Sequence, residues 1–71
     1  MKSITTNFTV EIFDEKPLRG YFEHNELGDN CAGELLFEGK DLIDYDGVFE
    51  LPKEVIQILR DMDFYVSEEF E

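Results

Sequence analysis

The sequence predicts an α+β domain: a four-stranded, mostly antiparallel sheet arranged as a meander, with one C-terminal α-helix packed on one face. Two observations predict it. Segments in which apolar and polar residues alternate, typical of half-buried strands, recur over the first 45 residues. A segment with the apolar spacing of a helix then follows Pro52. Because the loops between the alternating segments are short, successive strands should be antiparallel neighbours.

The first strand is expected over Ile4–Phe13, which alternates throughout and is rich in β-branched and aromatic residues. It should end before Pro17, since proline cannot donate a hydrogen bond to a neighbouring strand. A shorter strand is expected over Gly20–Asn25. The segment Glu26–Gly33 contains two glycines and an Asp-Asn pair, which predicts a loop.

The last two strands are expected to form a hairpin. Glu34–Glu38 and Asp41–Tyr45 both alternate, and Gly39 and Lys40 between them suit a two-residue turn. The residues predicted on the buried face of this hairpin are Leu35, Phe37, Ile43 and Tyr45.

The helix is predicted from Pro52, which suits the first helical position. Glu54 would lie in the first turn, where the positive end of the helix dipole stabilises a carboxylate. The predicted buried stripe consists of Val55, Ile58, Leu59 and Met62. Asp63 is expected to end the helix in the left-handed conformation, which aspartate tolerates.

After the helix, Phe64 and Val66 are expected to pack on the core. Residues 1–66 are therefore expected to form a single α+β domain. The segment Ser67–Glu71 is predicted to be a frayed acidic C-terminal tail.

The chain is strongly acidic. It has 18 Asp and Glu against six Lys and Arg, a net charge of -12 and a pI near 4.2. Solubility needs a net charge of only about 2 to 8 in magnitude, and the excess destabilises a compact fold by repulsion. We therefore expect a basic partner, such as a nucleic-acid-binding protein or a nuclease complex. Direct binding to nucleic acid or to an anionic membrane is not expected, because both would repel the chain.

Other features narrow the class of protein. Seven Phe and three Tyr argue against a disordered acidic tail. One cysteine, Cys31, permits no intrachain disulfide, which favours a reducing compartment. No apolar segment approaches the ~20 residues of a membrane span, and the first 13 residues lack the apolar segment of a signal peptide. A cytoplasmic protein is expected.

Strand alternation should sort the acids onto the sheet face that the helix leaves open. Alternate residues on a strand lie about 6.8 Å apart, which is comparable to the spacing of phosphates along a nucleic-acid strand. Phe13 and Tyr21 are expected on the same face as apolar anchors. The predicted partner-binding residues are Glu11, Glu23, Glu34, Leu36, Glu38, Leu42, Asp44 and Asp46.

No motif predicts catalysis, a metal or a cofactor. If Gly47 held the sixth position of an EF-hand loop, Leu42 and Lys53 would hold the first and twelfth, and neither is a calcium ligand. His24 and Cys31 are the only candidates for a base and a nucleophile, and they match no zinc or catalytic spacing. The protein is therefore not expected to be an enzyme.

The predicted function is that of a non-enzymatic interaction module: an inhibitor that mimics nucleic acid and binds the basic site of another protein. In length, acid content and single-domain organisation the chain resembles small phage inhibitors of host nucleases, including anti-restriction and anti-CRISPR proteins, although it shares no motif with them. Two alternatives remain open. The chain could be an antitoxin-like or regulatory subunit for one basic partner, or a homodimeric domain whose charge serves only solubility.

Overall fold

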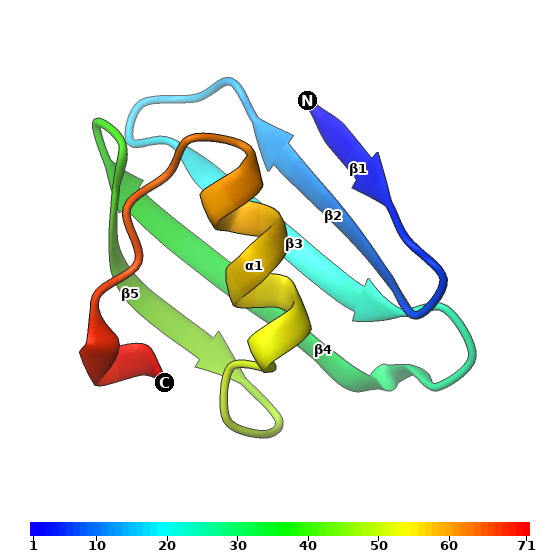
Figure 1. Ribbon diagram of the computed structural model, residues 1–71. Coiled ribbons are helices and arrows are strands. Elements are labelled where there is room, and N and C mark those ends of the chain that lie inside the picture. The colour runs from blue at the N-terminus through cyan, green and yellow to red at the C-terminus, as the bar shows by residue number, and fades with distance from the viewer.

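Five antiparallel strands follow one another across one sheet in chain order, and one helix crosses one face of this sheet (Figure 1). This is a computed structural model, and it describes residues 1–71. The elements are β1 (Lys2–Ile4), β2 (Phe8–Phe13), β3 (Arg19–His24), β4 (Gly28–Glu38), β5 (Asp41–Gly47), α1 (Lys53–Asp61) and a 3-10 helix, η1 (Glu68–Phe70). The α+β class and the antiparallel sheet with a C-terminal helix are confirmed, but the sheet has five strands and not four. Neither helix has the length and apolar character that crossing a membrane requires.

The additional strand arises because the predicted first strand is a hairpin. β1 and β2 pair antiparallel with Ser3 opposite Val10, and the chain turns between them at Thr5. The Thr5 backbone NH donates to the carbonyl of Phe8 at 2.8 Å, and the Phe8 NH donates to Oγ1 of Thr5 at 3.1 Å. Apolar and polar residues alternate straight through this turn, so the pattern does not mark the break.

A second difference lies between β3 and β4. The predicted loop is much shorter, because β4 already begins at Gly28, which has a φ of 57°. The pairing register of the two strands shifts between Glu23 and His24. β4 therefore runs for 11 residues and lies between β3 and β5 in the sheet.

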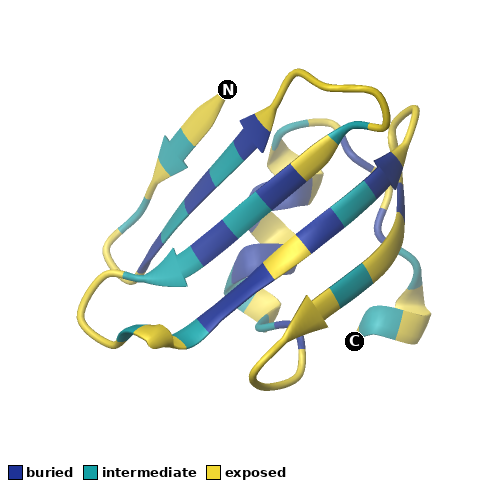
Figure 2. Ribbon diagram, turned by 180° about the vertical axis from the view of Figure 1, so that it is seen from behind, coloured by how far each residue is buried: buried dark blue, intermediate teal, exposed yellow.

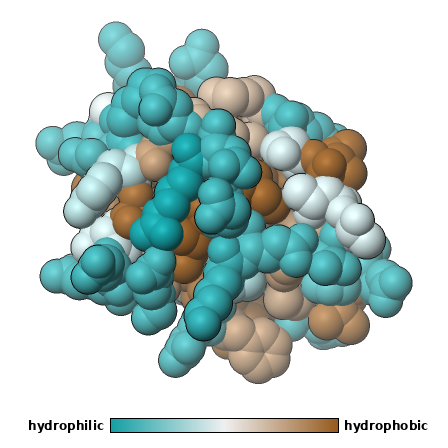
Figure 3. Space-filling view, in the orientation of Figure 1, coloured by the Kyte–Doolittle hydropathy of each residue, from teal (hydrophilic) through white to brown (hydrophobic).

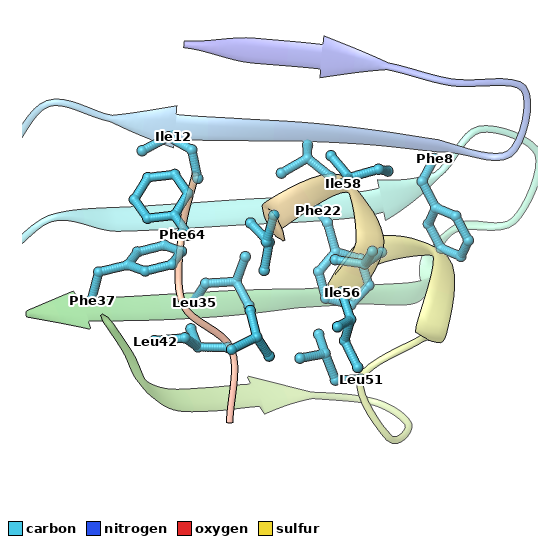
Figure 4. Close-up of a cluster of buried hydrophobic side chains, with 14 residues drawn as sticks. Phe8, Ile12, Phe22, Leu35, Phe37, Leu42, Leu51, Ile56, Ile58 and Phe64 are labelled. Carbon is cyan, nitrogen blue, oxygen red and sulfur yellow. The ribbon is translucent and has the colours of Figure 1, made fainter. Parts of the chain in front are cut away.

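The core lies between the sheet and α1 (Figure 4). Each strand from β2 to β5 contributes side chains from one face only, as the period of two requires. Phe37 and Phe64 contact each other with ring centroids 4.5 Å apart. The buried cluster consists of Phe8, Val10, Ile12, Phe22, Leu35, Phe37, Leu42, Leu51, Val55, Ile56, Ile58, Leu59, Phe64 and Val66.

A β-bulge reverses two predicted positions in β5. Leu36 pairs with Asp44 but Phe37 pairs with Leu42, so β5 holds one extra residue, Ile43. An extra residue shifts the alternation by one. Leu42 is therefore in the core, where it is 4% exposed, and the prediction that it lies on the open face is wrong. Ile43 is 48% exposed, and the prediction that it lies in the core is also wrong. Beyond the bulge, Tyr45 lies on the core side as predicted, where its ring packs against Phe22 with centroids 5.9 Å apart.

The helix agrees closely with its prediction. The helix begins at Lys53, one residue later than expected, and Pro52 is the residue that precedes it. Val55, Ile58 and Leu59 are buried, and Met62 is half-buried. Asp63 has a φ of 73°, which confirms the predicted left-handed ending.

The segment after the helix returns along the outer edge of β5. Phe64 and Val66 are buried as predicted. Between them, the Tyr65 backbone NH donates to the carbonyl of Lys40 at 2.8 Å. The Tyr65 carbonyl accepts a hydrogen bond from the backbone NH of Leu42 at 3.0 Å. The segment predicted as a frayed tail contains the 3-10 helix η1, and Arg60 of α1 forms an ion pair with Glu71 at its end, at 2.9 Å.

Candidate functional site

The face of the sheet opposite α1 has no element of the fold over it (Figure 2). We call it the open face and define it by the strand positions that alternate with the core residues. Its side chains are those of Lys2, Ile4, Thr9, Glu11, Phe13, Arg19, Tyr21, Glu23, Ala32, Glu34, Leu36, Glu38, Asp41, Asp44 and Asp46.

The structure places all six predicted acids on the open face. One row runs straight across the sheet from Glu11 through Tyr21 and Glu34 to Asp46. Leu36 also lies on this face and is half-buried, whereas Leu42 lies on the opposite side in the core. The remaining predicted acids on the open face are Glu23, Glu38 and Asp44.

Acids face acids across the last two strands. Glu34 is directly opposite Asp46, and Glu38 is directly opposite Asp41, which the sequence prediction had not included. Like charges in directly opposite positions destabilise a sheet. The open side of β4 and β5 carries five carboxylates and no base, so this pair of strands is the most negative part of the face.

None of the acids on the open face forms an ion pair. The protein has two ion pairs, Lys40 with Asp63 at 3.2 Å and Arg60 with Glu71. Both ion pairs involve the segment that follows α1, on the helix side of the molecule. Figure 3 shows this side, where apolar atoms are visible between hydrophilic side chains. The carboxylates of the open face are therefore free to meet external cations.

Two bases on the open face were missed. Lys2 lies in β1, the strand that was not predicted, and is directly opposite Glu11 of β2. Arg19 lies opposite both Phe13 and Leu36. Counting back two residues from Tyr21 along the alternation would have placed Arg19 on this face. The anionic surface is thus interrupted at one corner and near its middle.

The centre of the open face is hollowed. This central hollow has a volume of about 510 Å³ and is open to water. Phe13, Tyr21 and Leu36 supply apolar surface inside it, and Arg19 also lines it. The carboxylates that line it belong to Glu15, Glu34, Asp44 and Asp46. A second hollow continues past Leu36 toward the exposed Ile43.

Tyr21 is held in a negative environment. Its hydroxyl donates to Oδ1 of Asp29 at 3.4 Å. Partial removal from water raises the pKa of Tyr21 above its ordinary value of 10.0, and the negative charges of Asp29 and Glu23 raise this pKa further. The phenol therefore stays neutral, and its ring remains available as an uncharged surface among carboxylates.

The residues considered for catalysis have structural contacts. Nδ1 of His24 accepts the backbone NH groups of Glu26 and Leu27 at 3.1 and 3.3 Å, and its ring packs edge-on against Phe8. Cys31 packs against the core cluster. No three His, Cys, Asp or Glu side chains come together in a way that could hold a metal ion.

Comparisons with protein-family models, with curated proteins and with solved structures found no match for this chain. The open face and its hollow are therefore interpreted on their own geometry and charge.

Proposed function

We propose that this protein is a non-enzymatic inhibitor whose open face occupies the basic nucleic-acid site of another protein. The observation that carries the proposal is the collection of unpaired carboxylates on one uncovered sheet face, with Glu34 and Asp46 directly opposite each other. This arrangement lowers the stability of the free protein. A cationic partner would relieve the repulsion.

The spacing of the acids supports nucleic-acid mimicry. Alternate residues on one strand, such as Asp44 and Asp46, lie about 6.8 Å apart, and neighbouring strands lie about 4.8 Å apart. A basic cleft that binds phosphates at similar intervals can therefore engage several of these carboxylates at once. The resulting affinity should fall steeply with salt, as it does for phosphate contacts, and opposite fields should speed association.

Apolar surface inside the acidic rim supports a protein partner. Phe13 is 41% exposed, and Leu36 and Tyr21 are half-buried beside it in the central hollow. Tight interfaces commonly consist of aromatic and aliphatic anchors surrounded by polar residues. A face that served only solubility would not need such anchors.

The alternatives predict different behaviour. A homodimer through the open face would bring Glu34, Asp44 and Asp46 of one copy near the same acids of the other, which opposes association; a monomer in sedimentation at micromolar concentration would exclude it. An antitoxin-like or regulatory subunit would bind one basic partner without mimicking nucleic acid. Competing duplex DNA or RNA should displace a mimic, whereas it need not displace such a subunit.

The test is charge reversal on the open face. Glu38→Lys combined with Asp44→Lys should abolish capture of basic nucleic-acid-binding proteins from a lysate at low salt, because both carboxylates lie on the most negative pair of strands. The matched control is Glu68→Lys with Glu69→Lys in η1, which changes the net charge equally away from this face. Both pairs of side chains are exposed, so the fold should persist.

Capture is measured by affinity purification with the wild type and both double variants, followed by competition with duplex DNA. Loss of capture in the open-face variant alone, with release by DNA, would support the proposal. Equal capture by all three proteins would reject it.

A further inference from the structure

We propose that the central hollow receives an arginine side chain of the basic partner in preference to a lysine. The inference rests on the proposed function and specifies the chemistry of its recognition site. It combines three properties of the hollow: a neutral aromatic surface, unpaired carboxylates around it, and a resident cation that a partner must displace.

The aromatic surface favours a guanidinium group. Tyr21 and Phe13 both line the hollow, and Leu36 adds an aliphatic surface beside them. The Tyr21 hydroxyl also lies beside a carboxylate, with Oδ1 of Asp29 at 3.4 Å. Guanidinium is planar and weakly hydrated, so it stacks on aromatic rings at a low desolvation cost, whereas the lysine ammonium holds its water strongly.

The carboxylates supply matching acceptors. Glu34, Asp44 and Asp46 line the same hollow, and none of them has a cationic partner in the protein. Carboxylates accept two parallel hydrogen bonds from one guanidinium, a geometry that an ammonium group cannot reproduce. An arginine that enters can therefore contact ring and carboxylate together.

Arg19 is the resident cation. It lines the hollow, lies opposite Leu36 in the β3–β4 pairing, and forms no ion pair. It therefore opposes an incoming cation without being fixed to any one carboxylate. Its removal should strengthen binding of an arginine-containing segment, the reverse of the effect expected if Arg19 itself held the partner.

The experiment measures fluorescence anisotropy with labelled octa-arginine and octa-lysine peptides at 150 mM salt. Wild type should bind octa-arginine about fivefold more tightly than octa-lysine, which is the upper range for cation–π contacts at exposed sites. Tyr21→Leu, which retains an apolar side chain, should reduce this ratio, and the part that remains should come from the carboxylates of the hollow. Arg19→Gln should tighten octa-arginine binding. Tyr65→Leu, at an exposed tyrosine beside the outer edge of β5, is the matched control and should keep the wild-type ratio.

Equal affinities of the two peptides for the wild type would overturn the inference, as would an arginine preference that Tyr21→Leu leaves undiminished. If Glu38→Lys with Asp44→Lys still weakens both peptides equally in that case, the electrostatic basis of the proposed function survives. If neither peptide binds the wild type, both the inference and the proposed function lose their support.

Discussion

Tyr45 packs at the end of the β4–β5 pair through contacts that depend on two glycines. Its ring lies over Gly33 and Gly47, which face each other across β4 and β5, and its hydroxyl donates to the carbonyl of Phe49 in the loop that leads to α1. Aromatic rings often cover glycines in sheets in this way. Alternation placed Tyr45 on the core side correctly, but the same count failed two residues earlier at Ile43. Leu42 and Ile43 are both suitable core residues, so the sequence contains no signal of the bulge that selects between them.

Gly33→Ala should therefore destabilise the protein. A Cβ at Gly33 would lie 2.8 Å from a ring carbon of Phe22 and would also collide with the Tyr45 ring. Overpacking of this kind costs about 1–3 kcal/mol, which urea unfolding monitored by circular dichroism can measure. Leu27→Ala, at a 53% exposed position, should change the free energy of unfolding by less than about 0.5 kcal/mol. A Gly33→Ala variant as stable as the wild type would contradict this account of the Tyr45 contacts.

Among the elements, those whose boundaries depend on residues close in sequence were the ones that the sequence predicted. The helix was predictable because the apolar stripe lies within it and Pro52 and Asp63 lie within two residues of its ends. The turn between β1 and β2 was not, since some of the contacts that stabilise it are distant in sequence. Glu54 of α1 accepts hydrogen bonds from the Thr5 hydroxyl and the Asn7 side-chain amide at 3.1 and 3.0 Å. A contact between Thr5 and a residue 49 positions away leaves no local pattern in the sequence.

The end of α1 gives a prediction at the same scale. Asp63 is the one residue other than glycine with a positive φ, 73°. Its ion pair with Lys40 is largely exposed and contributes little stability. Asp63→Gly should therefore be more stable than Asp63→Ala by about 1 kcal/mol, because only the alanine variant has a Cβ in the left-handed conformation. Both variants remove the same charge and the same ion pair, so the difference between their urea midpoints isolates the backbone term. Equal midpoints would show that the helix ends in another way.

Across the whole molecule, the sequence predicted the open face better than it predicted the sheet. The six acids required only that their strands alternate, which does not depend on strand order. The central hollow could not be predicted, because it is formed by β2, β3, β4 and β5 together with the loop residue Glu15. Lys2 was missed with β1, and Arg19 acquires its place in the hollow only when β3 lies beside β4.

The dimensions of the molecule make its stability sensitive to salt. The protein measures 30 × 24 × 20 Å. The Debye length is about 30 Å at 0.01 M salt and about 8 Å at 0.15 M. At the lower concentration each of the 18 acids therefore repels acids across the entire fold, whereas at the higher one it repels only its neighbours.

We expect the Tm to rise by several degrees between 0.01 and 0.15 M NaCl, since about 1 kcal/mol of relieved repulsion raises the Tm of a domain of this size by about 4–8 °C. Glu34→Gln combined with Asp46→Gln removes a directly opposed pair, so this variant should have the higher Tm at low salt and gain less from added salt. Calorimetry at both concentrations tests both expectations, and a Tm that is flat or falls with salt would contradict them. Partner binding through the same carboxylates should respond in the opposite direction and weaken as salt increases. The two opposite slopes separate the repulsion within the free protein from the attraction toward a partner.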